Sequence, residues 1–256
     1  MFFSLPGFFK SQSQSPFSFG NALDFDGVND NVTASNVSIA GASTTGVTVS
    51  LWMKPDTITT GNNQVVFSTA RANNKTFALQ KRDSNGAGYL RVLARSSTTN
   101  WINFESALTS TNWHHIFLVY DGSQATSDDR VKMWVNGSEI TAKTSSTASQ
   151  PTSIAADCLQ DFTAGVWASA TTFTKVYYPG LLDEFAIWTD YVGNGTEAAS
   201  LYNSGNGALA TSVIPSPERY YRLDESGSTA TATDDSGNGN TGTLNNFTLP
   251  GAWVAH

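Results

Sequence analysis

Two adjacent acidic residues, Asp183 and Glu184, are the best candidates for acid–base chemistry in the chain. Glycoside hydrolysis uses two carboxylates that flank one scissile bond, so both must face the same cleft. The segment LLDEFAIW around them is apolar and aromatic, as expected of a strand, and successive side chains of a strand point to opposite faces. His114 and His115 are divided between two faces for the same reason. No Glu-x-Asp-x-x-Glu pattern occurs in the chain, and the sequence therefore argues against a glycoside hydrolase or lyase.

Oxygen-bearing side chains that could bind a cation are concentrated in residues 234–240, DDSGNGN. They stand at alternate positions before a glycine, as in calcium loops, with Asp234 and Asn238 as candidate ligands. The bidentate Glu that closes an EF-hand loop is missing, because Asn245 stands at that position. The loop is thus an incomplete calcium motif.

Two further places offer carboxylates to a metal. Asp26 and Asp30 lie in a second oxygen-rich turn, and Asp183 is a third candidate within a predicted strand. Ordinary Asx turns, in which a carboxylate accepts hydrogen bonds from nearby backbone amides, explain the turn patterns equally well. Both interpretations stay open at this point.

Two tryptophans are candidates for binding a ligand. Residues 47–53 alternate, with Val47, Val49, Leu51 and Met53 predicted to face inward and Trp52 outward. Trp134 falls on the polar face of its own strand. Aromatic rings on a sheet surface can stack on the apolar faces of sugars while neighbouring polar groups bind the hydroxyls. The alternative is that a loop or the C-terminal segment covers both rings.

The stretch from residue 112 to residue 142 predicts the architecture that must position these side chains. It contains one strand from Trp113 to Tyr120, a polar loop, and two short strands around Asn136-Gly137. Asn-Gly between alternating strands favours a type I′ hairpin, because both central residues need positive φ. Trp134 is then opposite Glu139. Other short strands joined by Asn- and Gly-rich turns favour a single all-β sandwich.

Outside these strands, the chain shows three distinct segments. Residues 1–19 hold six phenylalanines around a Ser/Gln spacer and are predicted to be an extended aromatic arm, which either docks on a partner subunit or folds back on the sandwich. Thr196 is predicted to cap one helix that stops at Asn203. Residues 141–153 are predicted to form a long exposed loop. Residues 216–256 are expected to add edge strands to the sandwich formed by residues 20–256.

Several motifs in series resemble one known family. WHHIFLVYDG followed by VKMWVNG, together with ALDFDGVNDNV, VTVSLWMKPD and PGLLDEFAIW, are similar to those of laminin G-like, concanavalin A-like jelly-roll domains over roughly residues 20–205. The resemblance implies a jelly-roll β-sandwich. Members of this family bind glycans, proteins and lipids, and some are enzymes, so function stays open. Laminin G-like domains often hold one calcium, and the resemblance therefore implies one structural Ca²⁺ without locating it.

Composition restricts the partners. A net charge of −7 and the absence of a Lys/Arg cluster argue against nucleic acid and anionic membranes. No apolar run approaches the ~20 residues that span a bilayer, so membrane insertion is not expected. The one cysteine, Cys158, cannot form an internal disulfide. The first 20 residues make a poor signal peptide, because they lack a positive n-region.

These observations predict a non-catalytic recognition or adhesion module, with a glycan or cell-surface polysaccharide as its ligand. We expect it to be mounted on a larger assembly such as a virion, as head decoration or tail appendage, or on another extracellular surface, with residues 1–19 contacting other subunits. The alternative is a purely structural or protein-binding component, and a glycoside hydrolase or lyase comes third.

Overall fold

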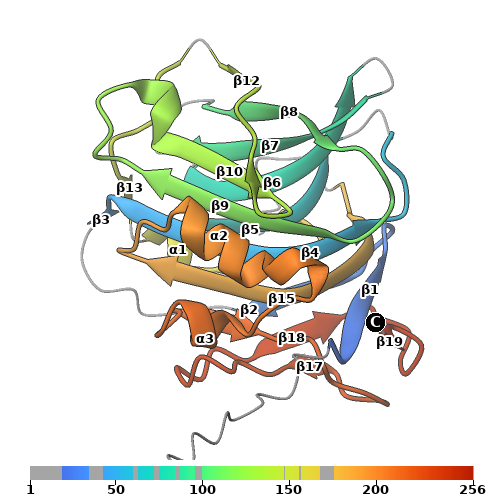
Figure 1. The fold of residues 1–256 in the computed structure, drawn as a ribbon. Helices are drawn as coiled ribbons and strands as arrows, with labels where there is room; N and C mark the ends of the chain where they lie inside the picture. Colours follow the sequence, from blue (N-terminus) through green and yellow to red (C-terminus); the bar gives the residue numbers. More distant parts are fainter. Residues whose placement is uncertain are drawn as a thin grey trace, which may run out of the picture.

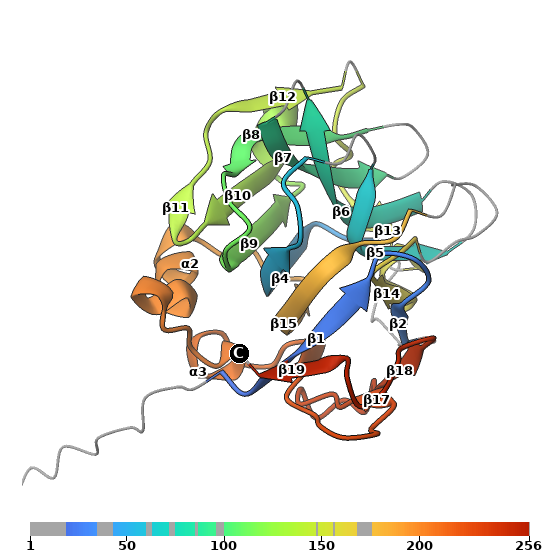
Figure 2. The same cartoon turned by 90° about the vertical axis from the view of Figure 1, so that its right-hand side faces the viewer.

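The computed structural model describes residues 19–34, 43–59, 63–71, 75–84, 87–95, 100–146, 148–155, 157–167 and 176–255. These residues form two antiparallel sheets packed against each other, which confirms the all-β sandwich (Figures 1 and 2). The predicted arm of residues 1–19 lies outside the described residues except for Phe19.

Sheet A contains, in spatial order, β11 (Ser138–Glu139), β10 (Val131–Val135), β9 (His114–Asp121), β4 (Gly46–Pro55), β15 (Pro179–Thr189), β1 (Asn21–Asp26) and β19 (Trp253–Ala255), with β16 (Arg219–Tyr221) also paired to β15. Sheet B contains β12 (Lys143–Ser145), β8 (Ile102–Leu108), β7 (Ala87–Arg95), β6 (Lys75–Ser84), β5 (Gln64–Arg71), β14 (Phe162–Ala164), β2 (Asn31–Ala34), β18 (Gly242–Asn245) and β17 (Thr231–Ala232). The small pair is β3 (Ser43–Thr44) with β13 (Ile154–Ala155), and the helical segments are η1 (Ser127–Arg130), α1 (Asp157–Gln160), α2 (Gly195–Tyr202), η2 (Asn203–Gly205) and α3 (Ala210–Val213).

Alternation along the strands places the core between the sheets. Val49 and Leu51 of β4 lie fully buried in the same cluster as Phe77 and Leu79 of β6. Because side chains alternate, the next residues of each strand must face away from this core. The outer faces of the two sheets are therefore the surfaces on which a ligand site can be built.

The predicted hairpin is present in the expected register. Asn136 and Gly137 have φ of 51° and 74°, as a type I′ turn requires. Trp134 is paired with Glu139 across this turn. The prediction that residues 141–153 form one long exposed loop is wrong in part, because strand β12 lies in this segment and pairs with β8.

Helix α2 begins two residues earlier than predicted. Asn194, not Thr196, is the N-cap: its side chain accepts hydrogen bonds from the backbone N–H groups of Thr196 and Glu197. The Glu197 side chain accepts one from the N–H of Asn194, which completes a capping box. This cap fixes where α2 starts on the outer face of sheet A (Figure 1).

The C-terminal segment joins the edges of both sheets beside the N-terminal strands. β19 pairs with β1 in sheet A, and β18 pairs with β2 in sheet B (Figure 2). Within the described ranges, no helix is long and apolar enough to cross a membrane.

Candidate functional site

Trp52 lies on the outer face of sheet A but is covered. The residue is only 4% exposed, and the ring centres of Phe19, His115 and Tyr202 lie 4.9, 5.2 and 5.9 Å from that of Trp52. Tyr202 is the last residue of α2. The alternation correctly gave the side of the sheet, but helix α2 and Phe19 occupy the surface that a ligand would need. The expected exposed stacking platform is therefore corrected to a buried aromatic cluster.

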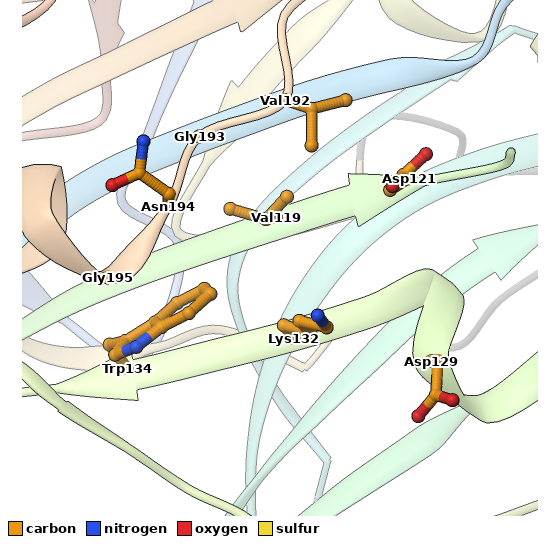
Figure 3. A pocket seen from close by; sticks show the side chains of 9 residues that line it. All are labelled: Val119, Asp121, Asp129, Lys132, Trp134, Val192, Gly193, Asn194 and Gly195. Atoms are coloured by element: carbon orange, nitrogen blue, oxygen red, sulfur yellow. The ribbon is translucent and has the colours of Figure 1, made fainter. Parts of the chain in front are cut away.

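Trp134 is also mostly covered, at 7% exposed, but it lines a pocket (Figure 3). Its ring packs edge-on against Phe117, 5.8 Å away, within a second buried cluster that includes residues of α2 and α3. A Cβ on Gly195 would lie 3.1 Å from the indole nitrogen, so a glycine lets the loop approach the ring closely. Only part of the indole thus remains available to a ligand.

The pocket beside Trp134 has a volume of about 200 Å³. Figure 3 shows Lys132 on the same strand and Asn194 in the loop that borders the pocket. Its lining residues are Val119, Asp121, Asp129, Lys132, Trp134, Val192, Gly193, Asn194 and Gly195. We call this the Trp134 pocket.

The charges of the Trp134 pocket are already engaged within the protein. The pKa of Asp121 is lowered: burial by itself raises it, but hydrogen bonds from Ser123 and Gln124 and the charge of Lys132 outweigh that effect. Asp129 forms an ion pair with Lys143 at 3.6 Å. One cation among two carboxylates gives the pocket no strong preference for a charged ligand.

A second groove lies on the outer face of sheet B. Leu90, Val92 and Ala94 of β7 point into the core, so Arg91 and Arg95 point outward. The groove has a volume of about 240 Å³ and is lined by Asn63, Gln80, Arg91, Leu93, Arg95, Trp167 and Val176. We call it the β7 groove.

The floor of the β7 groove is apolar and its sides are polar. Leu93 and Trp167 belong to a buried cluster separate from the main core, with Trp101 packed against it. The guanidinium of Arg91 lies over the Trp101 ring, 4.3 Å from its centre, and its Nε donates to Asn103 Oδ1 at 2.7 Å. These contacts orient the planar guanidinium before any ligand arrives.

The acidic pair Asp183 and Glu184 is buried in sheet A, at 0% and 4% exposed. The prediction that they face opposite sides assumed regular alternation, but Glu184 has a φ of 50° and the register shifts between Asp183 and Ala186. Tyr220 donates a hydrogen bond to Glu184. Burial is the main cause that raises the pKa of each carboxyl to about 8. Neither residue lines the Trp134 pocket or the β7 groove.

The predicted metal ligands in the first turn serve mainly as Asx acceptors. Asp26 Oδ1 accepts the N–H groups of Val28 and Asn29 at 2.7 and 3.1 Å. Asp30 Oδ2 accepts the N–H of Asp26 at 3.0 Å, while its Oδ1 is buried without a hydrogen-bond partner. Burial, together with the charges of Asp26 and Asp24, raises the pKa of Asp30.

The loop at Asp234 likewise satisfies its own oxygens. Asp234 accepts backbone N–H groups from Tyr220, Ser236 and Asn240 at 2.7–3.1 Å. Asn238 donates from its amide to the carbonyls of residues 217 and 218. These contacts tie the loop to β16.

The five predicted ligands are therefore divided among the first turn, strand β15 and the 234–240 loop. Across the part of the chain that the structure describes, no three His, Cys, Asp or Glu side chains are placed to hold a metal ion. Calcium binding stays a prediction, and the described residues give no arrangement of ligands from which a role for the ion follows.

The fold and these sites can now be compared with known proteins. Residues 26–198 match the family model Laminin_G_3, described as the concanavalin A-like lectin/glucanases superfamily. The chain belongs to this superfamily. The match confirms the resemblance that the sequence motifs indicated. No curated protein matches the sequence.

Solved structures of the same fold include a putative carbohydrate binding protein from Bacteroides ovatus, with a TM-score of 0.62 and 16% identity over 94% of this chain. The match covers 63% of that protein, so the superfamily member described here spans less than two thirds of its length. A heptameric SAP-like pentraxin from Limulus polyphemus has a TM-score of 0.52 and 16% identity, covering 72% of this chain and 82% of the other. At these identities the likeness shows the fold.

The residues of the β7 groove were not among those predicted for this superfamily member. The segment YLRVLAR carries the relevant signal, because inward Leu90, Val92 and Ala94 alternate with outward Arg91 and Arg95. The sequence does not show which strands are neighbours in the sheet. Gln80 lies directly opposite Arg91 on β6, and Trp167 follows β14 much later in the chain.

Proposed function

We propose that this chain is a non-catalytic glycan-recognition module and that the β7 groove binds the saccharide. The observation that carries the proposal is the composition of the groove. An apolar floor of Leu93 and Trp167 lies beside amide and guanidinium groups from Gln80, Asn63 and Arg91. Saccharides present apolar C–H faces and polar hydroxyls, so a site of this composition can contact both.

The preset orientation of Arg91 adds to this argument. Its stacking on Trp101 and its bond to Asn103 hold the planar donor group in one geometry. A donor that is already ordered loses less entropy when a ligand binds. Such pre-organisation favours recognition of a specific ligand by this face.

Sheet A has a different role in this proposal. Its outer face carries Trp52 and Trp134 beneath α2, so it is mainly an internal packing surface. The Trp134 pocket is the second candidate site, because part of the indole and Lys132 still line it. Trp52 has no ligand role in this proposal, in contrast to the expectation from sequence.

We further propose that the module is mounted on an extracellular or virion assembly, with residues 1–19 contacting another subunit. Phe19, the one described residue of this segment, lies edge-on against Trp52 at 4.9 Å. This contact places Phe19 beside Trp52 and the end of α2, so a partner that holds the segment is proposed to lie on this side of the sandwich. The alternative is a structural or protein-binding module without a saccharide ligand. Absence of binding to every glycan in the following experiment would favour this alternative.

The test is binding of the purified chain to a broad glycan and polysaccharide array, with calcium and with chelator. We expect saturable binding that Asn63→Ala and Trp167→Leu weaken and that Lys132→Ala, in the Trp134 pocket, leaves unchanged. Loss of binding in Lys132→Ala alone would move the site to sheet A. A blank array from protein that melts cooperatively would reject the glycan proposal.

A further inference from the structure

The charge of the β7 groove is opposite to that of the chain as a whole. The chain has a net charge of −7, yet the groove residues that the structure describes include two arginines and no Asp or Glu. Glu105, two residues along β8 from Asn103, lies outside the groove lining and accepts a hydrogen bond from Thr144 at 2.6 Å. A locally cationic groove on an anionic protein favours a small anionic ligand over a long polyanion, which the rest of the surface repels.

The two arginines differ in exposure: Arg91 is partly exposed, whereas Arg95 is only 9% exposed and contributes mainly its charge. Arg91 and Arg95 leave the same face of β7 about 13 Å apart along the strand, with Leu93 between them. Arg82 extends the positive charge along the same face from β6, where its guanidinium lies 5.7 Å from the centre of the Tyr89 ring. The floor next to Arg91 is apolar, so a ligand lying along β7 contacts the charge of Arg91 and then the apolar surface of Leu93 and Trp167.

The geometry of Arg91 indicates which anion fits. Its Nε is used by Asn103 and one face of its guanidinium by Trp101. Within the described part of the chain, its terminal amino groups make no further hydrogen bond. Two parallel N–H donors of an arginine match the two oxygens of a carboxylate, which a lysine cannot do.

We propose that the β7 groove binds an acidic saccharide through a sugar carboxylate held by Arg91. Arg91 binds the carboxylate, and Leu93 and Trp167 contact the sugar ring beside it. This inference rests on the proposed glycan-binding function and names its ligand class. Arginine stays charged throughout the ordinary pH range, so binding depends on ionisation of the sugar acid and not of the protein.

The experiment uses the full chain and a panel of oligosaccharides in matched pairs. Oligogalacturonate, oligomannuronate and oligosialate are each compared by calorimetry with the methyl ester of the same oligosaccharide, which has no charge. Sulfated oligosaccharides form a third arm, because arginine also binds sulfate. We expect at least one carboxylated probe to bind, its ester to bind about tenfold or more weakly, and salt to weaken the carboxylated probe selectively.

The variants test the assignment to this groove. Arg91→Gln is expected to weaken the carboxylated probe about tenfold, while Lys54→Gln, at an exposed position of sheet A outside both candidate sites, removes the same charge and leaves binding unchanged. Arg91→Lys keeps the charge and loses the paired donors, so its affinity should fall between those of the wild type and Arg91→Gln. If Arg91→Gln unfolds at too low a temperature for its binding to be measured, the comparison is made with Arg91→Lys.

The outcomes separate this inference from the function on which it rests. Equal binding of acid and ester, or equal binding by Arg91→Gln and Lys54→Gln, overturns the acidic-ligand inference and leaves glycan recognition intact. Binding of sulfated probes alone overturns the assignment to carboxylates. Binding to no saccharide of the panel or of the array, by folded protein, overturns both.

Discussion

Replacing Trp52 separates a structural role from a ligand-binding role. The residue is 4% exposed and its ring contacts three other rings, so Trp52→Ala would leave a cavity between β4 and α2. Truncation of a buried tryptophan to alanine typically costs about 3–5 kcal/mol. Domains of ordinary stability have about 5–15 kcal/mol in total, so the variant should still fold but melt markedly earlier.

The contact between Trp52 and Tyr202 allows a second free energy to be predicted, the coupling between the two rings. The Tyr202 ring is stacked with Trp52 at 5.9 Å and 30°. A double-mutant cycle with Trp52→Ala and Tyr202→Ala should therefore give a coupling of about 0.5–1.5 kcal/mol. Urea unfolding monitored by far-ultraviolet circular dichroism gives each free energy of unfolding.

Saccharide binding of the same variants supplies the contrast. Trp52→Ala should keep the affinity of the wild type under conditions where it is folded, because the β7 groove is on the other sheet. Trp52→Phe is the control, with a smaller loss of stability and the same affinity. A Trp52→Ala protein that loses less than about 1 kcal/mol but no longer binds saccharide would refute the argument that Trp52 is a packing residue.

Three further perturbations test other parts of the structure. Asn194→Ala removes the side-chain acceptor for two N–H groups of α2, and should cost about 1 kcal/mol in urea unfolding, whereas Thr196→Ala should cost less. Asp183 has a pKa raised to about 8 by burial, so its folded-state preference for the neutral form stabilises the protein at low pH and is lost as pH rises from about 4 to 8. Asp183→Asn should remove that contribution, at most about 1.4 kcal/mol per pH unit, and a pH series of urea unfolding that is as steep for the variant as for the wild type would contradict it. Calcium should raise the melting temperature and chelator lower it if the predicted ion is bound, since a ligand of the folded state stabilises it; identical melting curves would reject the prediction.

Local patterns in the sequence predict the parts of this fold that depend on local chemistry. Asn136-Gly137 specifies its own turn, because few other residue pairs accept positive φ twice. The alternation of residues 47–53 predicts which side chains of β4 lie on each face, because successive side chains of a strand point to opposite sides. The serial motifs then identify the superfamily, which supplies the arrangement of the sheets.

The candidate sites depend on long-range contacts, and the sequence predicts them poorly. Alternation shows that Trp52 faces outward from the core, but it cannot show that Tyr202 lies over it. At Glu184 even alternation fails, because an irregular residue with positive φ interrupts the strand. The β7 groove requires the order of strands in sheet B, which brings Gln80 and Trp167 to Arg91 and Arg95.

The pairing of β1 with β19 has a mechanical consequence. Asn21 is the partner of Ala255, so the two ends of the folded region leave the sandwich at one point. Tension applied through both ends acts across the short β1–β19 ladder and opens its residue pairs one after another, instead of shearing them together. Under load this ladder should therefore peel first, while strands β5 to β8, which carry the groove, lie outside the line of force. Opening of this ladder under load should therefore leave the proposed ligand site on sheet B intact.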